Sequence, residues 1–179
     1  MKILLYSNDL DEQDVIDKLF VYLYQFLLQE RTVCWLRKTQ LDLIPSEEVC
    51  TDINMDALQF LLIYYVGKKF RFEIAEILTD YWFTESEDEE DGIDTKNDEN
   101  NENNIEKKEK PVEYLFIDLS DSDEEFIENI IPTLLEIEAE MKKINPDSEV
   151  FTTFCDDIFD DDTIDGFEIN WKNVELCKL

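Results

Sequence analysis

Histidine is absent from this 179-residue sequence, which removes the commonest general base and a common metal ligand. Cysteine is scarce: Cys34, Cys50, Cys155 and Cys177 stand far apart, and no C-x-x-C pair occurs. A zinc site would need closer spacing. Because three of the four lie in apolar runs, we expect reduced thiols in a protein core and an intracellular location.

Long hydrophobic runs are also missing. Met1-Lys2 leads to a short apolar run that ends at Asn8-Asp9, so we expect no signal peptide. The longest other run, Leu58 to Val66, is too short to span a bilayer. The sequence therefore predicts no membrane segment.

Positive charge is the third scarcity. The chain has 46 acidic and 16 basic residues, a net charge of −30. Residues 111–179 hold 20 of the acidic and 4 of the basic residues, so the imbalance grows toward the C-terminus. A field of this sign repels phosphate backbones and anionic lipids and favours protein partners with basic surfaces. A plain solubility surface is the alternative interpretation.

Apolar residues are nevertheless plentiful, at 44%, and they are arranged in alternating strands and helices. This order predicts one α/β domain over residues 1–179, with a mostly parallel sheet and helices on both faces. The predicted strands are 2–7, 31–38, 112–119, 149–155 and one or two within 167–178; the predicted helices are 12–30, 72–83 and 123–144, with 39–55 as loop or short helix. Residues 57–66 fit a strand and a buried helix almost equally, and we prefer the strand.

Residues 84–110 differ from the rest. Residues 85–91 are nearly all acidic, and 97–104 are only Asn, Asp and Glu. Such a segment has no apolar face whose burial could offset the entropy lost on ordering. We expect a disordered acidic insertion within the domain.

The most informative stretch follows Pro111. Six of the eight residues from 112 to 119 are apolar or aromatic, which predicts a short strand buried on both faces. The strand delivers Asp118, and Ser122-Asp123-Glu124-Glu125 then has the pattern of a capping box that opens a helix. Pro132 should kink this helix or shift its start.

The order of elements, with the sequence Leu115-Phe116-Ile117-Asp118, resembles the core of RecA-type recombination ATPases and their paralogues. In that family a first strand leads through a phosphate loop into a helix and a second strand. A later hydrophobic strand ends in the Walker B acid, which the resemblance places at Asp118. A generic Rossmann-like or α+β domain remains the alternative.

One corner departs from the family pattern. A phosphate loop needs G-x-x-x-x-G-K-[ST], because glycine amides and a lysine surround the phosphates. Residues 8–14 are Asn-Asp-Leu-Asp-Glu-Gln-Asp, with no glycine, no lysine and four carboxylates. The resemblance therefore implies an ATPase-dead paralogue without cofactor, metal or catalytic residues. Small members of that kind act in recombination-accessory complexes such as the Shu type, which implies the nucleus in a eukaryote.

The same stretch also resembles a SUMO-interacting motif. A hydrophobic core precedes an acidic tail, and such motifs add a strand to a partner's sheet. The residues concerned are Leu115, Phe116, Ile117, Asp118, Leu119, Asp121 and Asp123. The alternative is a core strand followed by a helix cap, since a strand cannot be central and also pair outward.

Two weaker patterns remain. Lys68, Lys69 and Arg71, with Arg37 and Lys38, form the one local basic patch, which is either a partner contact or a solvated turn. The stretch 161–166 suggests a calcium loop, but its position 12 would be Lys172, so a solvated acidic turn fits better.

These observations lead to three functional hypotheses. The first is a non-enzymatic, protein-binding subunit of a hetero-oligomeric complex, a degenerate RecA-type paralogue in recombination or repair. The second is an acidic inhibitor or DNA mimic, of phage or viral type, that occupies a basic nucleic-acid site. The third is an enzyme with a metal bound by carboxylates in the Asp-rich stretch.

Overall fold

The computed structural model describes residues 1–37, 44–65, 112–119, 124–158 and 171–179. Within these residues six strands form one sheet, in which every pairing is parallel. This architecture confirms the predicted α/β fold. In chain order the strands are β1 (Lys2–Tyr6), β2 (Val33–Arg37), β3 (Leu61–Tyr65), β4 (Tyr114–Asp118), β5 (Glu149–Cys155) and β6 (Glu175–Lys178), and their order in space is β3-β2-β4-β5-β1-β6.

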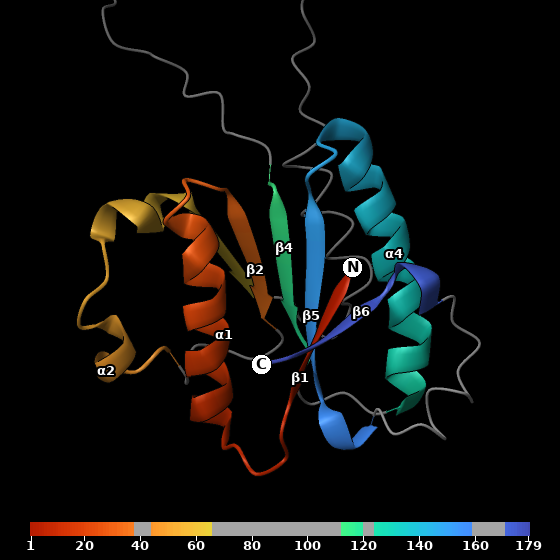
Figure 1. The fold of residues 1–179 in the computed structure, drawn as a ribbon, viewed down its shortest axis with the longest axis horizontal. Coiled ribbons are helices and arrows are strands. Elements are labelled where there is room, and N and C mark those ends of the chain that lie inside the picture. Colours follow the sequence, from red (N-terminus) through yellow and green to blue (C-terminus); the bar gives the residue numbers. More distant parts are fainter. Residues whose placement is uncertain (38–43, 66–111, 120–123, 159–170) are drawn as a thin grey trace, which may run out of the picture.

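Two long helices lie on opposite faces of this sheet (Figure 1). Helix α1 (Glu12–Leu27) leads from β1 across β5 and β4 to β2, and helix α4 (Glu124–Ile144) leads from β4 to its neighbour β5. The two connections run in opposite directions along the sheet. Right-handed crossovers then place their helices on opposite faces.

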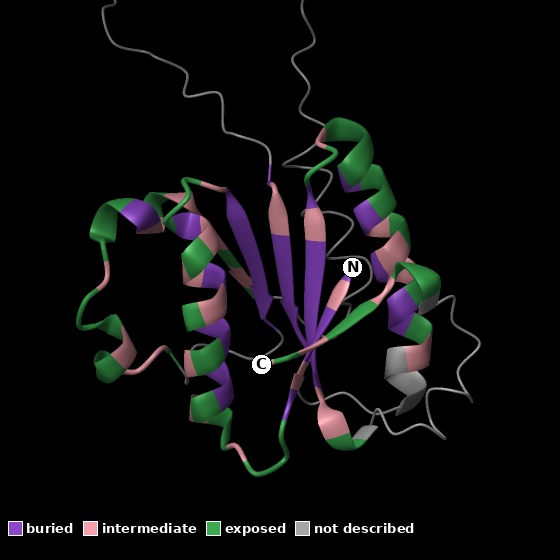
Figure 2. Cartoon of the chain, viewed as in Figure 1, coloured by how far each residue is buried: buried purple, intermediate pink, exposed green. Residues whose placement is uncertain are grey.

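The core is made by in-register rows of side chains. Trp35, Phe116 and Phe151 are aligned on three neighbouring strands and face α1. The rings of Phe116 and Phe151 stack at 4.4 Å with an interplanar angle of 3°. Residues one position along, such as Leu115 and Val150, face α4, because side chains alternate along a strand. Figure 2 shows the central strands buried along most of their length.

Helix α1 has an ordinary start and an unusual end. The Asp11 side chain caps it by accepting a hydrogen bond from the Asp14 amide at 2.8 Å. At the other end the Arg31 amide donates to the Phe26 carbonyl at 3.2 Å, the 6→1 bond of a Schellman turn. Glu30 occupies the left-handed position, with φ of 58°, where glycine is the usual residue.

Two sequence-based predictions need correction. Residues 57–66 were expected to form one strand, with a buried helix as the alternative; the chain forms a 3-10 helix over Met55–Phe60 and then β3. Asn54 caps this turn, and the apolar run that continues into β3 conceals the change of structure. The second prediction placed the cysteines in the protein core. Cys34 is buried there, but Cys50 is exposed and the other two are half-buried. Burial raises the pKa of the Cys34 thiol to about 12.

The structure describes only some of the remaining predicted elements. A short helix, α2 (Glu47–Cys50), lies in the predicted loop region. Pro132 was expected to kink the helix 123–144 or shift its start; α4 begins at Glu124 and continues through the exposed proline. The predicted helix 72–83, the acidic insertion 84–110 and the calcium-loop candidate 161–166 lie outside the described residues. In the described part of the chain, no helix has the length and apolar character that crossing a membrane requires.

Candidate functional site

The carboxyl ends of the strands meet at one edge of the sheet, seen at the lower side of Figure 1. In open α/β sheets, ligands bind outside this edge at a topological switch point. This is a place where the connections that follow two neighbouring strands lie on opposite faces of the sheet. Such a switch lies between β2 and β4. After β2 the segment 44–60 packs with α1, whereas after β4 the chain enters α4 on the other face. Arg37 and Asp118 are the last residues of these two strands.

Arg37, Asp118 and Thr153 form a buried polar row at this switch. They are aligned on adjacent strands, so all three lie on the α1 face, and each is less than a tenth exposed. The Arg37 guanidinium lies 4.8 Å from the ring centre of Trp35. Thr153 Oγ1 donates to Asp118 Oδ1 at 3.2 Å and accepts from the Leu119 amide at 3.3 Å. Thr153 thereby fixes the orientation of the Asp118 carboxylate.

The β1–α1 connection is the corner where a phosphate loop would lie. A turn closes it, with the Leu10 amide bonded to the Ser7 carbonyl at 3.0 Å. A helix N-terminus attracts anions through its free amides and dipole. Here the Asp11 carboxylate already occupies that position, and Glu12 and Asp14 add two more negative charges in the first turn. The corner therefore repels an incoming phosphate.

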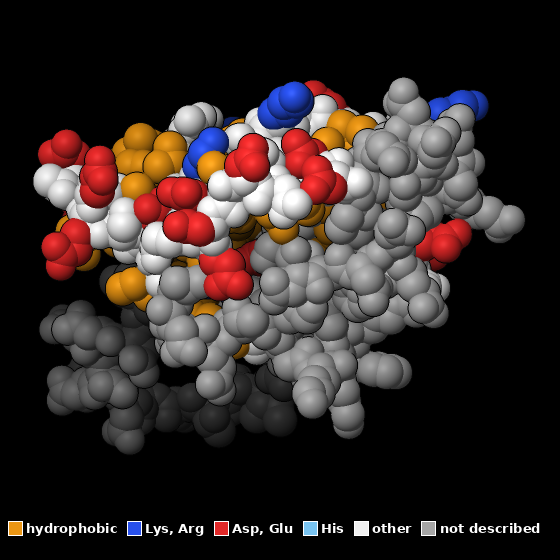
Figure 3. Space-filling model, turned by 90° about the horizontal axis from the view of Figure 1, so that it is seen from below, with side chains coloured by type: hydrophobic (Ala, Val, Ile, Leu, Met, Phe, Trp, Pro, Cys, Tyr) orange, Lys and Arg blue, Asp and Glu red, His pale blue; other side chains and the backbone are white. Residues whose placement is uncertain are grey.

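A hydrogen bond links this corner to the end of β5. Asn8 Nδ2 donates to Asp157 Oδ2 at 2.7 Å, across the gap between two neighbouring strands. Figure 3 views the molecule from this side and shows Asp and Glu side chains spread over the described part of the surface. Most of the charged side chains visible on the described part of this side are carboxylates.

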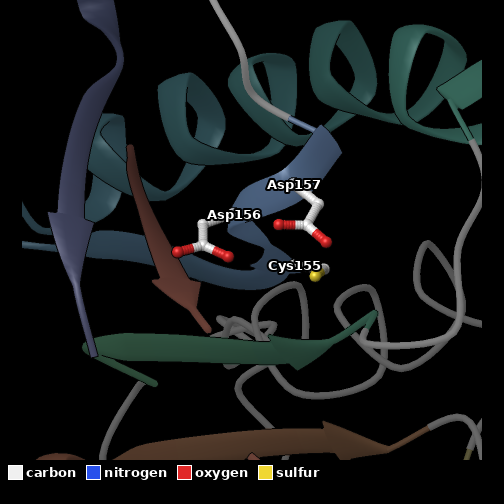
Figure 4. A group of neighbouring side chains, drawn as sticks. All are labelled: Cys155, Asp156 and Asp157. Carbon is white, nitrogen blue, oxygen red and sulfur yellow. The ribbon is translucent and has the colours of Figure 1, made fainter. Parts of the chain in front are cut away.

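Cys155, Asp156 and Asp157 follow one another at the end of β5 (Figure 4). One potential ligand atom from each lies within 4.8 Å of the others. Structural zinc sites use four ligands, and calcium takes six to eight oxygens. Asp157 is exposed and already bonded to Asn8. Among the described residues this trio thus offers an incomplete coordination sphere.

The residues predicted for partner binding are described only at 115–119, where they are buried. Leu115, Phe116, Ile117 and Leu119 are at most 1% exposed. Strand β4 pairs with β2 on one edge and β5 on the other, so it agrees with the core-strand alternative and offers no free edge to a partner strand. The remaining predicted residues, Asp121, Asp123, Lys68, Lys69 and Arg71, lie outside the described residues.

Sequence reasoning missed a buried ionic cluster at the amino edge of the sheet. Glu138 of α4 lies 2.7 Å from the Met1 amine and 3.1 Å from Lys142 Nζ, and it accepts from the Val150 amide at 3.3 Å. Burial alone would raise the pKa of the Glu138 carboxyl, but the hydrogen bonds from the amine and Lys142 lower it below its ordinary value. The only signal in the sequence was a carboxylate on the apolar face of a helix.

An open pocket of about 520 Å³ adjoins this cluster. Its charged lining alternates in sign, and Lys2 and Lys142 are already paired with Glu149 and Glu138. The pocket therefore selects neither anions nor cations strongly.

Comparisons of the chain with protein-family models, with curated proteins and with solved structures found no match.

Proposed function

We propose that this chain is a non-catalytic subunit that binds other proteins within a hetero-oligomeric complex. The observation that carries the proposal is the β1–α1 corner, where the Asp11 carboxylate caps α1 and no glycine or lysine is present to hold a phosphate. A phosphate loop of the RecA type needs amide donors and a lysine at that corner. This chain offers carboxylates there instead.

The buried acid at the end of β4 fits the same proposal. In a nucleotide-hydrolysing relative, a carboxylate in this place would serve a magnesium ion and a phosphate. Here Asp118 is 7% exposed and accepts a hydrogen bond from Thr153. We assign it a structural role, in which it satisfies a buried polar group at the carboxyl edge of the sheet. The chain needs no cofactor for that role.

We further propose that the chain is an ATPase-dead RecA-type paralogue in a recombination or DNA-repair accessory complex, which in a eukaryote would place it in the nucleus. Support comes from the order of strands and helices and from a hydrophobic central strand that ends in an acid. Its net charge of −30 favours binding to a basic surface of a protein over direct binding to nucleic acid.

The experiment that tests the first proposal is affinity purification of the full chain from its native source, combined with an ATPase assay of the isolated chain. We expect a stoichiometric protein partner and no hydrolysis above background. A chain that purifies alone, or that hydrolyses ATP at a rate abolished by Asp118→Asn, would contradict the proposal.

A second function is favoured by one observation, the carboxylates spread over the described part of the carboxyl edge in Figure 3. Such a surface suits an acidic inhibitor that mimics DNA on a basic protein. This alternative predicts that the partner is a nucleic-acid-binding protein, that duplex DNA competes with the chain for it, and that binding weakens steeply with salt. Association that is unaffected by DNA and by salt favours the accessory subunit instead.

A further inference from the structure

The segment 44–56, which follows β2, is hydrogen-bonded along one side of α1. Three side chains of α1, spaced four and seven residues apart, face one line of the helix and each bonds to this segment. The bonds join Gln13 Nε2 to the Ile44 carbonyl (2.9 Å), Asp17 Oδ1 to the Ser46 amide (2.8 Å) and Tyr24 Oη to the Asn54 amide (2.6 Å). The segment therefore runs in the same direction as α1, and Figure 1 shows the two side by side.

Large apolar side chains are exposed along the seam, by which we mean the line of contact between α1 and this segment. On α1, Val21 is 48% and Leu28 is 54% exposed; on the segment, Ile44 is 60% and Met55 is 72% exposed. At 100° per residue, Val21 and Leu28 lie about 60° and about 40° around the helix from Tyr24, on the solvent side of the seam. We call these four residues the apolar track. From Gln13, which holds Ile44, to Leu28 the track extends roughly 22 Å along α1.

The two stretches of chain that carry the apolar track are acidic. Residues 12–30 and 44–56 contain one cation, Lys18. The exposed acidic side chains in the same two stretches are Glu12, Asp14, Glu30, Glu47, Glu48, Asp52 and Asp56. An apolar centre with a charged rim is the usual anatomy of a protein-binding surface.

We propose that the apolar track is the docking surface for an amphipathic helix of a partner protein, with lysines and arginines on both sides of its apolar stripe. A helix of about 15 residues is roughly 22 Å long and matches the track. Opposite charges at the rim would steer the encounter and fix the register. A second copy of this chain would bring the same carboxylates against one another. The inference deepens the proposed function, since it names the kind of partner and the surface used.

The test uses two synthetic 18-residue peptides of identical composition, made of leucine, alanine, lysine and arginine. One places leucine at helical spacing to form a stripe, and the other scatters the same leucines around the helix. We expect fluorescence anisotropy to show at least about tenfold tighter binding of the striped peptide to the full chain. Equal affinities would reduce the interaction to charge attraction and overturn the proposal.

Matched variants locate the binding surface. Val21→Ser with Met55→Ser should weaken binding of the striped peptide about tenfold or more. Ile63→Ser with Leu176→Ser removes similarly exposed apolar groups, 43% and 41% exposed on the two edge strands, and should leave affinity unchanged. Equal losses in both variants, or dimerisation of the wild type that Val21→Ser abolishes, would overturn the proposal. Nucleotide binding tests the proposed function independently of either result.

Discussion

At the scale of residues, two adjacent threonines of β5 differ in whether their buried hydroxyl groups form hydrogen bonds. Thr153 bonds to Asp118 and to the Leu119 amide, whereas Thr152 Oγ1 is buried without a hydrogen-bond partner among the described residues. Their side chains point to opposite faces of the sheet. Only the first hydroxyl therefore contributes to stability.

Replacing each threonine with valine tests this difference. Thr153→Val leaves the buried Asp118 carboxylate and the Leu119 amide without that partner, so we expect a loss of about 2 kcal/mol in the free energy of unfolding. Thr152→Val removes a buried hydroxyl that bonds to nothing described, so it should be neutral or stabilising. Urea denaturation measures both. The account fails if the two substitutions have the same effect.

Glu138 makes stability depend on pH. Its carboxyl pKa is lowered in the folded chain, so its contribution is present above the ordinary carboxyl value of 4.5 and is lost as pH falls through the folded value. At neutral pH, Glu138→Gln should cost about 3 kcal/mol, because it leaves a buried amine without its charge partner.

The pH dependence and a neighbouring residue provide the controls. The difference between wild type and Glu138→Gln should shrink as pH falls below 4.5. Glu140→Gln, on the exposed side of the same helix, removes only a surface pair with Lys143 and should change little. A difference that stays constant with pH would mean that the charge of Glu138 does not matter.

At the scale of elements, the turn that ends α1 needs a left-handed backbone conformation at a position where the residue is not glycine. Glu30 has a positive φ, the only such non-glycine residue among those described. Glu30→Gly should therefore raise the free energy of unfolding by up to about 1 kcal/mol. Gln29→Gly, one position earlier, should lower it, since its φ is negative. Thermal denaturation of both variants checks the prediction, which fails if Glu30→Gly destabilises.

The elements themselves were largely readable from the sequence. The run 112–119 was short, apolar and bounded by Pro111 and Asp118, which is why β4 could be predicted as a buried strand. The long, broad apolar face of residues 12–30 predicted α1 in the same way. The strand preferred for residues 57–66 is present only over Leu61–Tyr65, because an unbroken apolar run has no periodicity that separates a 3-10 turn from a strand.

The candidate site was less accessible to sequence reasoning. Asp118 could be predicted as the residue that ends a buried strand, and the carboxylates of residues 8–14 could be read directly. The row Arg37, Asp118 and Thr153 could not, because it exists only through the register of β2, β4 and β5. Sequence distance also hid the contact of Glu138 with Met1.

At the scale of the whole molecule, the charge of −30 opposes the compact state through self-repulsion. Raising the NaCl concentration from about 0.02 M to 0.5 M shortens the Debye length from roughly 20 Å to below 5 Å. We therefore expect the melting temperature to rise by several degrees over this range. A melting temperature that falls with salt would show that attractive surface pairs dominate.

The central claim is that the chain's own carboxylates close the corner where a related fold would hold a nucleotide phosphate. Isothermal titration calorimetry with MgATP tests this most directly. The account predicts no detectable heat of binding at nucleotide concentrations up to about 1 mM, which corresponds to an affinity weaker than roughly −4 kcal/mol. Saturable binding at micromolar MgATP, lost in Asp118→Asn, would contradict it.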